Sequence, residues 1–354
     1  MHVLCAGDEF ITPAMFVDAL RPALGADTEF TTHTSRWPSE PWYATDEIAE
    51  AAGDEDEIAE AVRGVDLLVT HLAPVTERVL AGADQLRLVA TPRGGPTNVD
   101  LAAATRRRVA VVNLPGRNAR AVAEFTVGVL VAGRRNIALS HARMRDGEWT
   151  GDLYRYDQAG PELAGSTVGL VGLGQVGRRV ADLLRGFGVR LLAHDPYVDP
   201  DTATERGVEL VGLAELVAVS DVISLHARLT EETRWMIDAE VLGRVRPGAY
   251  LVNTARGELV DEAALVDALR SGRLSGAALD TYVTEPPARD HPLLAMPQVL
   301  TVSHLAGASK DVAHRGARRI AGEVARFVGE EPLEHCLNPE VLGRRPEARP
   351  GATG

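Results

Sequence analysis

The residues from Thr167 to Asp195 constrain the fold of this chain more strongly than any other stretch. A short apolar run, Thr167–Val171, leads into the sequence Gly-Leu-Gly-Gln-Val-Gly at 172–177. A segment with helical apolar spacing follows, and then a second apolar run, Val189–Ala193, just before Asp195. We therefore expect a strand, a glycine turn, a helix and a second strand, in that order.

The three glycines of this turn have separate predicted roles. Gly172 permits the tight turn, Gly174 lets the backbone approach a pyrophosphate, and Gly177 lets the helix pack closely against the strand. The free N–H groups at the start of the helix suit phosphate oxygens. Asp195, 18 residues past Gly177, can accept hydrogen bonds from ribose hydroxyls and would repel a 2′-phosphate. The stretch predicts a dinucleotide site that favours NAD over NADP.

The same glycine pattern can arise by chance as a plain turn before a helix, since the chain has 34 glycines. The flanking strand, the helix and the acid at the expected distance favour the dinucleotide interpretation.

The composition limits the class of protein. A length of 354 residues predicts about two domains. The net charge of −13 argues against a nucleic-acid partner, which requires a basic face. No apolar run is long enough to span a membrane, and no signal peptide pattern is present, so we expect a cytoplasmic protein without a membrane partner. The two cysteines, Cys5 and Cys336, form neither a disulfide framework nor a zinc pattern, and we expect no metal.

Strands and helices are expected to alternate on both sides of the glycine turn, which is typical of an α/β fold with parallel sheets. The first 100 residues form a predicted small α/β unit without a glycine fingerprint. Within this unit, Asp27–Asp56 is a polar stretch with expected turns at Pro38 and Pro41. After Asp195 we expect a sheet whose ligand lies beyond the carboxyl ends of the strands. Residues 341–354 are predicted to be a disordered tail.

A long apolar helix is predicted between these units, from Ala119 to about Arg134, with Asn118 as its cap. A helix that is apolar almost all round is either buried in the core or covered by a partner, and its place between units favours a dimer contact. A second helix, Ile137–Arg145, and a polar loop that contains Tyr154-Arg155-Tyr156 follow it.

Three polar residues follow predicted strands downstream of the glycine turn: Arg256, Glu285 and His304. Histidine can move a proton near neutral pH, and a carboxylate beside it orients the imidazole and favours its protonated form. A guanidinium can hold a substrate carboxylate. These residue types suit hydride transfer between a nicotinamide and the carbon of a 2-hydroxy acid, where a proton moves at the oxygen.

Each residue also has a purely structural interpretation, as a loop histidine, a surface ion pair or a turn residue before Pro286. Other histidines compete for the proton-transfer role, and spacing alone does not choose among them. These are His71, His141, His194, His226, His291 and His314.

The combined pattern resembles the D-isomer-specific 2-hydroxyacid dehydrogenases, the family that includes D-3-phosphoglycerate, glycerate/hydroxypyruvate and D-lactate dehydrogenases. The resemblance covers about residues 60 to 330. The segments that carry it are VVNLPGRNARAVAEFTVG (111–128), TVGLVGLGQVGRRVADLLRGFG (167–188), HDPY (194–197), SLHARLTEETRWMI (224–237), RPGAYLVNTARGELVDEAALVDAL (246–269), GAALDTYVTEPP (276–287) and TVSHLAGAS (301–309).

The resemblance implies roles for residues at matching positions. Arg256, Glu285 and His304 match the catalytic residues of the family, and Arg93, Gly94 and Gly95 fall, with Arg256, where the substrate is held. The implied NAD-binding residues are Gly172, Gly174, Gln175, Val176, Gly177, Asp195, His226, Thr230, Thr254, Ala255, Asp280 and Gly307.

The resemblance also implies a two-lobed α/β architecture. A Rossmann-type, doubly wound NAD-binding domain at 101–297 is expected within a smaller flavodoxin-like substrate domain at 1–100 and 298–340, with closure by hinge motion. A homodimer through the helices after Asn118 is implied too.

The implied activity is NAD-dependent hydride transfer to and from a small 2-keto/2-hydroxy acid. Arg93 departs from the Gly-Val/Ala-Gly core expected in the substrate loop: it either meets a second anionic group, as in a 3-phosphoglycerate-like substrate, or pairs with a neighbouring acid. No C-terminal regulatory domain is expected. Two alternatives stay open, namely an NAD(H)-sensing, corepressor-like interaction protein on the same scaffold and a phosphite or phosphonate dehydrogenase.

Overall fold

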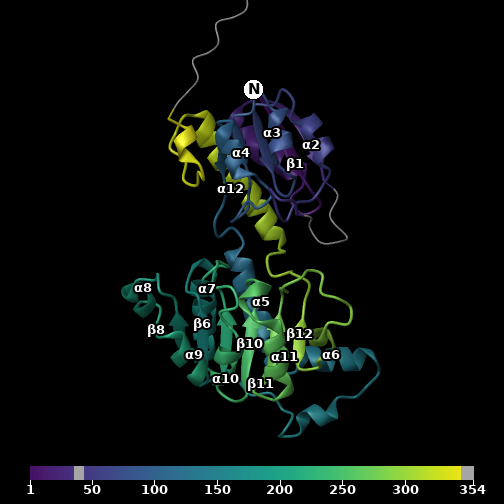
Figure 1. Cartoon of the computed structure of the whole chain (residues 1–354), viewed down its shortest axis with the longest axis vertical. Coiled ribbons are helices and arrows are strands. Elements are labelled where there is room, and N and C mark those ends of the chain that lie inside the picture. Colours follow the sequence, from purple (N-terminus) through teal and green to yellow (C-terminus); the bar gives the residue numbers. More distant parts are fainter. Residues whose placement is uncertain (36–43, 344–354) are drawn as a thin grey trace, which may run out of the picture. The chain divides into compact units, whose positions relative to one another are not determined.

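The computed structural model describes residues 1–35 and 44–343. The chain forms two compact units, one made of Met1–Arg117 with Ser309–Gly354 and the other of Asn118–Ala308 (Figure 1). Pro38, Pro41 and the predicted tail from residue 344 onward lie outside the described residues. Among the described residues, no helix is both long and apolar enough to cross a membrane.

The first unit is built on a five-stranded parallel sheet in the order β2-β1-β3-β4-β5. Its strands are β1 (His2–Gly7), β2 (Glu29–Thr34), β3 (Leu67–Thr70), β4 (Leu88–Ala90) and β5 (Ala110–Val112). Its helices are α1 (Pro13–Leu24), α2 (Glu55–Ala61), α3 (Glu77–Ala81), α4 (Leu101–Arg106) and α12 (Lys310–Val328).

Alternating residues of the central strands supply two separate cores, as expected for strands buried on both faces. Leu4 and Ala6 of β1 pack with α2, α3 and α4. Val3 and Cys5 of β1 pack with α1 and α12 on the other face. Burial raises the pKa of the Cys5 thiol to about 12, which agrees with an inert core residue.

The second unit is built on a seven-stranded parallel sheet in the order β12-β11-β10-β9-β6-β7-β8. Its strands are β6 (Thr167–Val171), β7 (Arg190–His194), β8 (Val208–Leu210), β9 (Val222–Leu225), β10 (Ala249–Asn253), β11 (Leu274–Leu279) and β12 (Val299–Thr301). Its helices are α5 (Ala119–Arg134), α6 (Ile137–Arg145), α7 (Gln175–Leu184), α8 (Pro200–Thr204), α9 (Leu213–Val219), α10 (Ala239–Arg244) and α11 (Glu262–Arg270).

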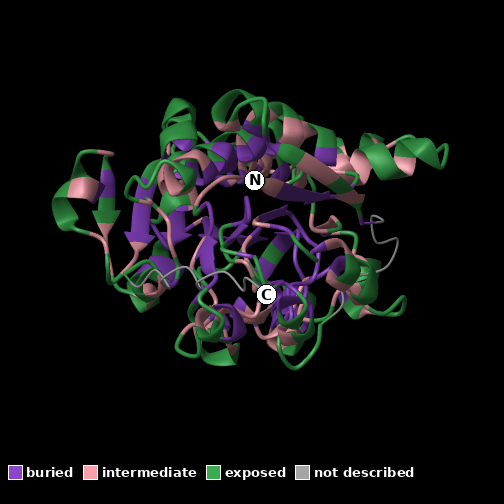
Figure 2. Ribbon diagram, turned by 90° about the horizontal axis from the view of Figure 1, so that it is seen from above, coloured by how far each residue is buried: buried purple, intermediate pink, exposed green. Residues whose placement is uncertain are grey.

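Helices cover both faces of this sheet: α5 and α7 pack on one face, and α9, α10 and α11 pack on the other. The strands are largely buried and the outer helix surfaces are exposed (Figure 2). The chain reverses its direction of winding between β6 and β9, which makes this the topological switch point where doubly wound sheets bind ligands. The predicted α/β class, with a Rossmann-type unit and a flavodoxin-like strand order in the other, is confirmed.

The boundaries between the units differ from the expected ones at 100/101 and 297/298. The strand β5 pairs with β4, so residues 101–117 belong to the first unit. The strand β12 pairs with β11, so residues 298–308 belong to the second unit. Strand pairing therefore moves both boundaries toward the C-terminus.

Some local predictions were incomplete. The polar stretch Asp27–Asp56 contains the edge strand β2, and the segment after Asp195 contains α8 and the edge strand β8. Asn118 does occupy the N-cap position of α5, but its side chain makes no capping hydrogen bond. The start of the helix was therefore predicted correctly and its cap was not.

Candidate active site

The glycine turn between β6 and α7 has the geometry that its sequence predicts. Gly172 has a positive φ of 98°, and a Cβ there would lie 2.6 Å from the backbone nitrogen of Ala227. A Cβ on Gly177 would lie 2.2 Å from the carbonyl oxygen of Gly172. At Gly174, the N-cap of α7, a Cβ would meet nothing within 4 Å. Two glycines are thus required by packing, whereas the third leaves open space at the start of the helix.

Asp195, at the end of β7, is attached to this turn. One carboxylate oxygen accepts the backbone N–H of Leu173 at 2.8 Å, and the other accepts the N–H of Tyr197 at 3.0 Å. The carboxylate therefore lies beside the glycine turn, as a ribose-binding acid should.

The other residues expected near NAD lie on the loops after β9, β10 and β12. Buried Thr254 bonds through its hydroxyl to that of Thr126 on α5 at 2.7 Å. The His226 Nε2 lies 3.0 Å from the Ser224 hydroxyl, and burial lowers the pKa of His226 to about 3, so its ring is neutral. Exposed Thr230 bonds to Thr233. A Cβ on Gly307 would lie 2.9 Å from the Asn118 amide nitrogen.

Glu285 and His304 form a hydrogen-bonded pair. The His304 Nδ1 lies 2.7 Å from Glu285 Oε2, and Glu285 Oε1 accepts the backbone N–H of Tyr282 at 3.0 Å. His304 adopts a left-handed φ of 53°, and its backbone N–H donates to the Asp280 carbonyl at 2.8 Å. Because Nδ1 faces the carboxylate, Nε2 is the ring nitrogen that can exchange a proton with a substrate.

Buried Asp280 fixes the loop that carries His304. Its carboxylate accepts the backbone N–H groups of Leu305 at 2.6 Å and Ala306 at 3.0 Å. Burial raises the pKa of Asp280, although these two hydrogen bonds act in the opposite direction. The family resemblance implied a contact of Asp280 to the cofactor, and the structure adds this positioning role.

The electrostatics of the pair keep Glu285 ionised. Burial would raise the pKa of Glu285, but the hydrogen bond and charge of His304, the Tyr282 N–H and the charge of Arg256 outweigh burial and lower it. Arg256 is exposed directly after β10 and donates to the carbonyl of Ala255 at 2.8 Å. An anionic carboxylate beside an imidazole orients the ring and stabilises its protonated form.

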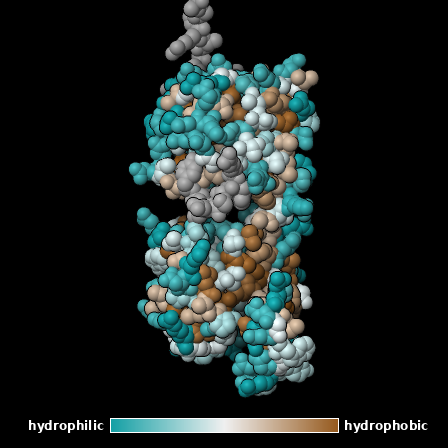
Figure 3. Space-filling model, turned by 90° about the vertical axis from the view of Figure 1, so that its right-hand side faces the viewer, coloured by the Kyte–Doolittle hydropathy of each residue, from teal (hydrophilic) through white to brown (hydrophobic). Residues whose placement is uncertain are grey.

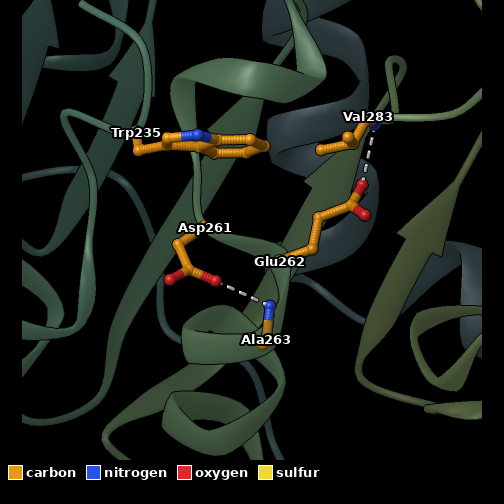
Figure 4. Close-up of a pocket in the computed structure, with 5 residues that line it drawn as sticks. All are labelled: Trp235, Asp261, Glu262, Ala263 and Val283. Atoms are coloured by element: carbon orange, nitrogen blue, oxygen red, sulfur yellow. Dashed lines mark hydrogen bonds between the residues drawn. The ribbon is translucent and has the colours of Figure 1, made fainter.

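A residue that the sequence did not single out supports Glu285. The carboxylate of Glu262, at the start of α11, accepts the backbone N–H of Val283 at 3.0 Å (Figure 4). It thereby holds the segment between Asp280 and Glu285. Trp235, Asp261 and Ala263 line a pocket together with Glu262 and Val283, and none of the predicted site residues lines it. Glutamate on a helix after a strand carries no distinctive sequence signal for this role.

In the first unit, the Arg93 side chain forms an ion pair with Glu50. One guanidinium nitrogen contacts the Glu50 carboxylate and the other donates to the Glu50 carbonyl at 2.9 Å. Of the two interpretations of Arg93, the structure therefore contains the pairing with a neighbouring acid. Gly94 and Gly95 follow it in a tight loop whose Gly94 carbonyl accepts the Asn113 amide at 2.8 Å.

The structure thus gathers Arg256, Glu285, His304 and the glycine turn in one unit. They follow β10, β11, β12 and β6, whose carboxyl ends lie at the same edge of a parallel sheet. His291 of the same unit lies 3.4 Å from Glu262, and His194 contacts the Val211 carbonyl at 3.2 Å. His304 differs from these histidines in its shorter, 2.7 Å contact with a carboxylate, that of Glu285, whose pKa is lowered.

Comparison with known proteins agrees with the dinucleotide-binding site described above. Residues 127–306 match the family model described as D-isomer specific 2-hydroxyacid dehydrogenase, NAD binding domain. D-3-phosphoglycerate dehydrogenase of Mycobacterium tuberculosis is 40% identical over 286 residues, which cover 80% of this chain and 53% of that protein. Glyoxylate reductase of Korarchaeum cryptofilum is 38% identical over 298 residues, which cover 84% and 90%. The chain spans about half the length of the phosphoglycerate dehydrogenases that it matches.

Solved structures share the fold. The TT0316 protein of Thermus thermophilus matches with a TM-score of 0.78 at 30% identity, covering 95% of this chain and 100% of that one. The NAD-dependent formate dehydrogenase of Staphylococcus aureus, in complex with NAD, matches with a TM-score of 0.71 at 29% identity, covering 94% and 97%. These likenesses agree with the α/β architecture described above.

Proposed function

Because the chain belongs to the D-isomer-specific 2-hydroxyacid dehydrogenase family, we propose that it catalyses reversible hydride transfer between NAD(H) and a small 2-keto or 2-hydroxy acid. NAD is the cofactor, since the matched part of the chain is the NAD binding domain of the family. The observation that carries the proposal is the 2.7 Å pair of His304 and Glu285 on the edge of the sheet that also bears the glycine turn.

The residues of the second unit fit this cofactor. The open space at Gly174 and the start of α7 would accept the pyrophosphate, and Asp195 would accept the ribose hydroxyls. Gln175 and Val176 would offer backbone N–H groups, and the loops of His226, Thr230, Thr254, Ala255, Asp280 and Gly307 would surround the rest. Bound NADH supplies the hydride.

His304 and Arg256 would carry the remaining chemistry. Protonated His304, held by ionised Glu285, gives its Nε2 proton to the oxygen of the 2-keto group during reduction and takes it back during oxidation. Arg256 binds the substrate carboxylate and polarises the keto oxygen. In the first unit, we propose that the backbone N–H groups of Gly94 and Gly95 bind a substrate carboxylate. The names of the relatives include D-3-phosphoglycerate dehydrogenase and glyoxylate reductase, which supports the class of small 2-keto acids.

We further propose a homodimer that forms through α5 and α6. No residue of α6 is buried, and Ile137 and Met144 are 54% and 46% exposed. Apolar side chains gather on the side of the second unit where α6 is labelled in Figure 1 (Figure 3). A partner would cover such a face.

An NADH-consumption assay with glyoxylate, hydroxypyruvate, pyruvate and larger 2-keto acids tests the activity. We expect turnover by the wild type, and a loss of about 10²–10⁴-fold in kcat for His304→Ala with NADH binding retained. The matched control is His314→Ala, on the exposed surface of α12. Retention of a tenth or more of the wild-type kcat would refute the role of His304. Tight NADH binding without turnover of any 2-keto acid would instead favour a sensor.

A further inference from the structure

The first unit has a topological switch point of its own. Its strand order, β2-β1-β3-β4-β5, places the switch between β1 and β3, and ligands of such sheets bind beyond the carboxyl ends of these strands. Asp8 directly follows β1, and His71 directly follows β3. Both side chains are almost fully buried, at 1% and 3% exposure. The family resemblance gave neither residue a role.

These two residues and Arg117 form a chain of hydrogen bonds. Asp8 accepts the backbone N–H groups of Phe10 and Ile11, each at 2.8 Å, and lies 2.6 Å from the His71 Nδ1. Burial, aided by the nearby charges of Arg117 and Arg93, lowers the pKa of His71 to about 4 despite its bond to Asp8. A neutral His71 donates from Nδ1 to Asp8 and accepts at Nε2 from Arg117, at 3.0 Å.

Within this series of hydrogen bonds, Arg117 is the residue that still has an unused donor group. Its Nη1 is buried without a hydrogen-bond partner, and no carboxylate of residues 1–35 or 44–343 forms an ion pair with it. Burial and the charge of Arg93 lower the pKa of Arg117 to about 10, which still leaves it charged at neutral pH. The charge of Asp8 acts on Arg117 through space, but no acceptor meets its buried Nη1 group. A buried donor without an acceptor is costly, so the arrangement suits a ligand that supplies one.

The charged side chains next to Arg117, those of Asp8 and Arg93, already have hydrogen-bond partners. Asp8 is held by His71 and two backbone N–H groups. Arg93 pairs with Glu50. The cluster therefore offers the Nη1 group of Arg117, which still lacks an acceptor, and a planar guanidinium matches the shape of a single carboxylate.

Arg117 also lies next to the loop proposed for the keto-acid carboxylate. The backbone N–H of Leu114 donates to the Arg93 carbonyl at 2.8 Å. A Cβ on Gly94 would lie 3.9 Å from the backbone nitrogen of Gly116, the residue before Arg117. A small molecule with one carboxylate at Gly94–Gly95 could therefore extend a second one to Arg117.

We propose that Arg117, oriented by His71 and Asp8, binds a second carboxylate of the substrate, so that the substrate class is the 2-oxo dicarboxylic acids. This inference rests on the proposed dehydrogenase function. It assigns the second anion to Arg117 and not to Arg93.

The test compares substrates of matched length, with the chain of residues 1–354 and NADH. Oxaloacetate and 2-oxoglutarate are set against 2-oxobutyrate and 2-oxopentanoate, and 3-phosphohydroxypyruvate tests a phosphate in place of the carboxylate. We expect kcat/KM to be about 10- to 150-fold higher for the dicarboxylates, the factor of one hydrogen bond to a charged group. Preference for the phosphate, or none for a second anion, would overturn the inference and leave the dehydrogenase function intact. No turnover of any 2-keto acid would instead remove the proposed function.

Variants of Arg117 test whether this residue causes the preference for dicarboxylates. Arg117→Gln should lose it by a similar factor while kcat/KM for 2-oxobutyrate changes less than about threefold, and Arg117→Lys should retain part of it. Arg63→Gln, an exposed arginine of the same unit that pairs with Glu60, is the matched control. Equal losses on all substrates, with unchanged NADH binding and Tm, would contradict a specificity role for Arg117. If Arg117→Gln does not fold, the Lys variant and the wild-type substrate series still decide the question.

Discussion

At the scale of single residues, the charge of Glu285 makes the stability of the fold depend on pH. Its usual pKa of 4.5 is lowered in the folded chain, so its ionised form stabilises the fold. That contribution is complete above 4.5 and disappears as the pH falls through the lowered pKa of the folded state. The hydrogen bond to His304 is a main source of this stability.

Glu285→Gln removes the charge and keeps the shape. We expect the variant to be less stable at pH 7 by about 1–2 kcal/mol, since the pair is partly exposed. The difference from the wild type should stay constant from pH 7 to 5.5 and shrink below pH 4.5. Urea unfolding at several pH values measures it, and a difference that grows toward acid pH would contradict the assigned pKa direction.

The sequence predicted which residues belong to the site, but it did not predict the contacts that these residues make. Arg256, Glu285 and His304 could be selected because each follows a strand of one parallel sheet. The ion pair of Arg93 with Glu50 could not be foreseen, because 43 residues separate the partners and only folding brings them together. For the same reason the buried Asp8–His71–Arg117 chain could not be foreseen, since its residues come from three separate loops.

At the scale of elements, different glycines of the turn between β6 and α7 serve packing and cofactor binding. Gly177→Ala would place a methyl 2.2 Å from the Gly172 carbonyl oxygen, whereas Gly174→Ala places one in open space. We expect Gly177→Ala to lower stability by about 1–3 kcal/mol. Gly174→Ala should leave Tm almost unchanged and weaken NADH binding, because the methyl blocks approach to the backbone. Thermal unfolding and NADH fluorescence titration distinguish the two, and equal effects on Tm would contradict this division.

The elements that escaped prediction are edge strands. β2 (EFTTHT) and β8 (VEL) lie at sheet edges and are only partly buried. An edge strand needs no continuous apolar run, so its sequence resembles a loop. The buried central strands, in contrast, carry the Val- and Leu-rich runs that made them recognisable.

At the scale of the whole molecule, the chain order of the units follows from the position of the glycine turn in the middle of the sequence. A fingerprint-free α/β segment precedes the turn, and the amphipathic helix α12 rejoins that segment's sheet afterwards. The insertion was therefore predictable. The boundaries of the inserted unit were not predictable. A short strand such as β5 or β12 belongs to the sheet in which it pairs, and the apolar content of the strand does not reveal that partner.

The exposed segment after α5, which contains Trp149 and Tyr154, predicts that two copies of the chain associate. Trp149 and Tyr154 are 83% and 94% exposed, and burial of such aromatic rings commonly dominates interface energies. We expect the wild type to be a dimer by light scattering and Trp149→Ser to shift it toward monomer, with a dissociation constant raised by about tenfold or more. Tyr197→Ser, 85% exposed on the loop after β7, is the matched control and should leave the dimer unchanged. A monomeric wild type, or an equal shift with Tyr197→Ser, would mean that this segment does not mediate self-association.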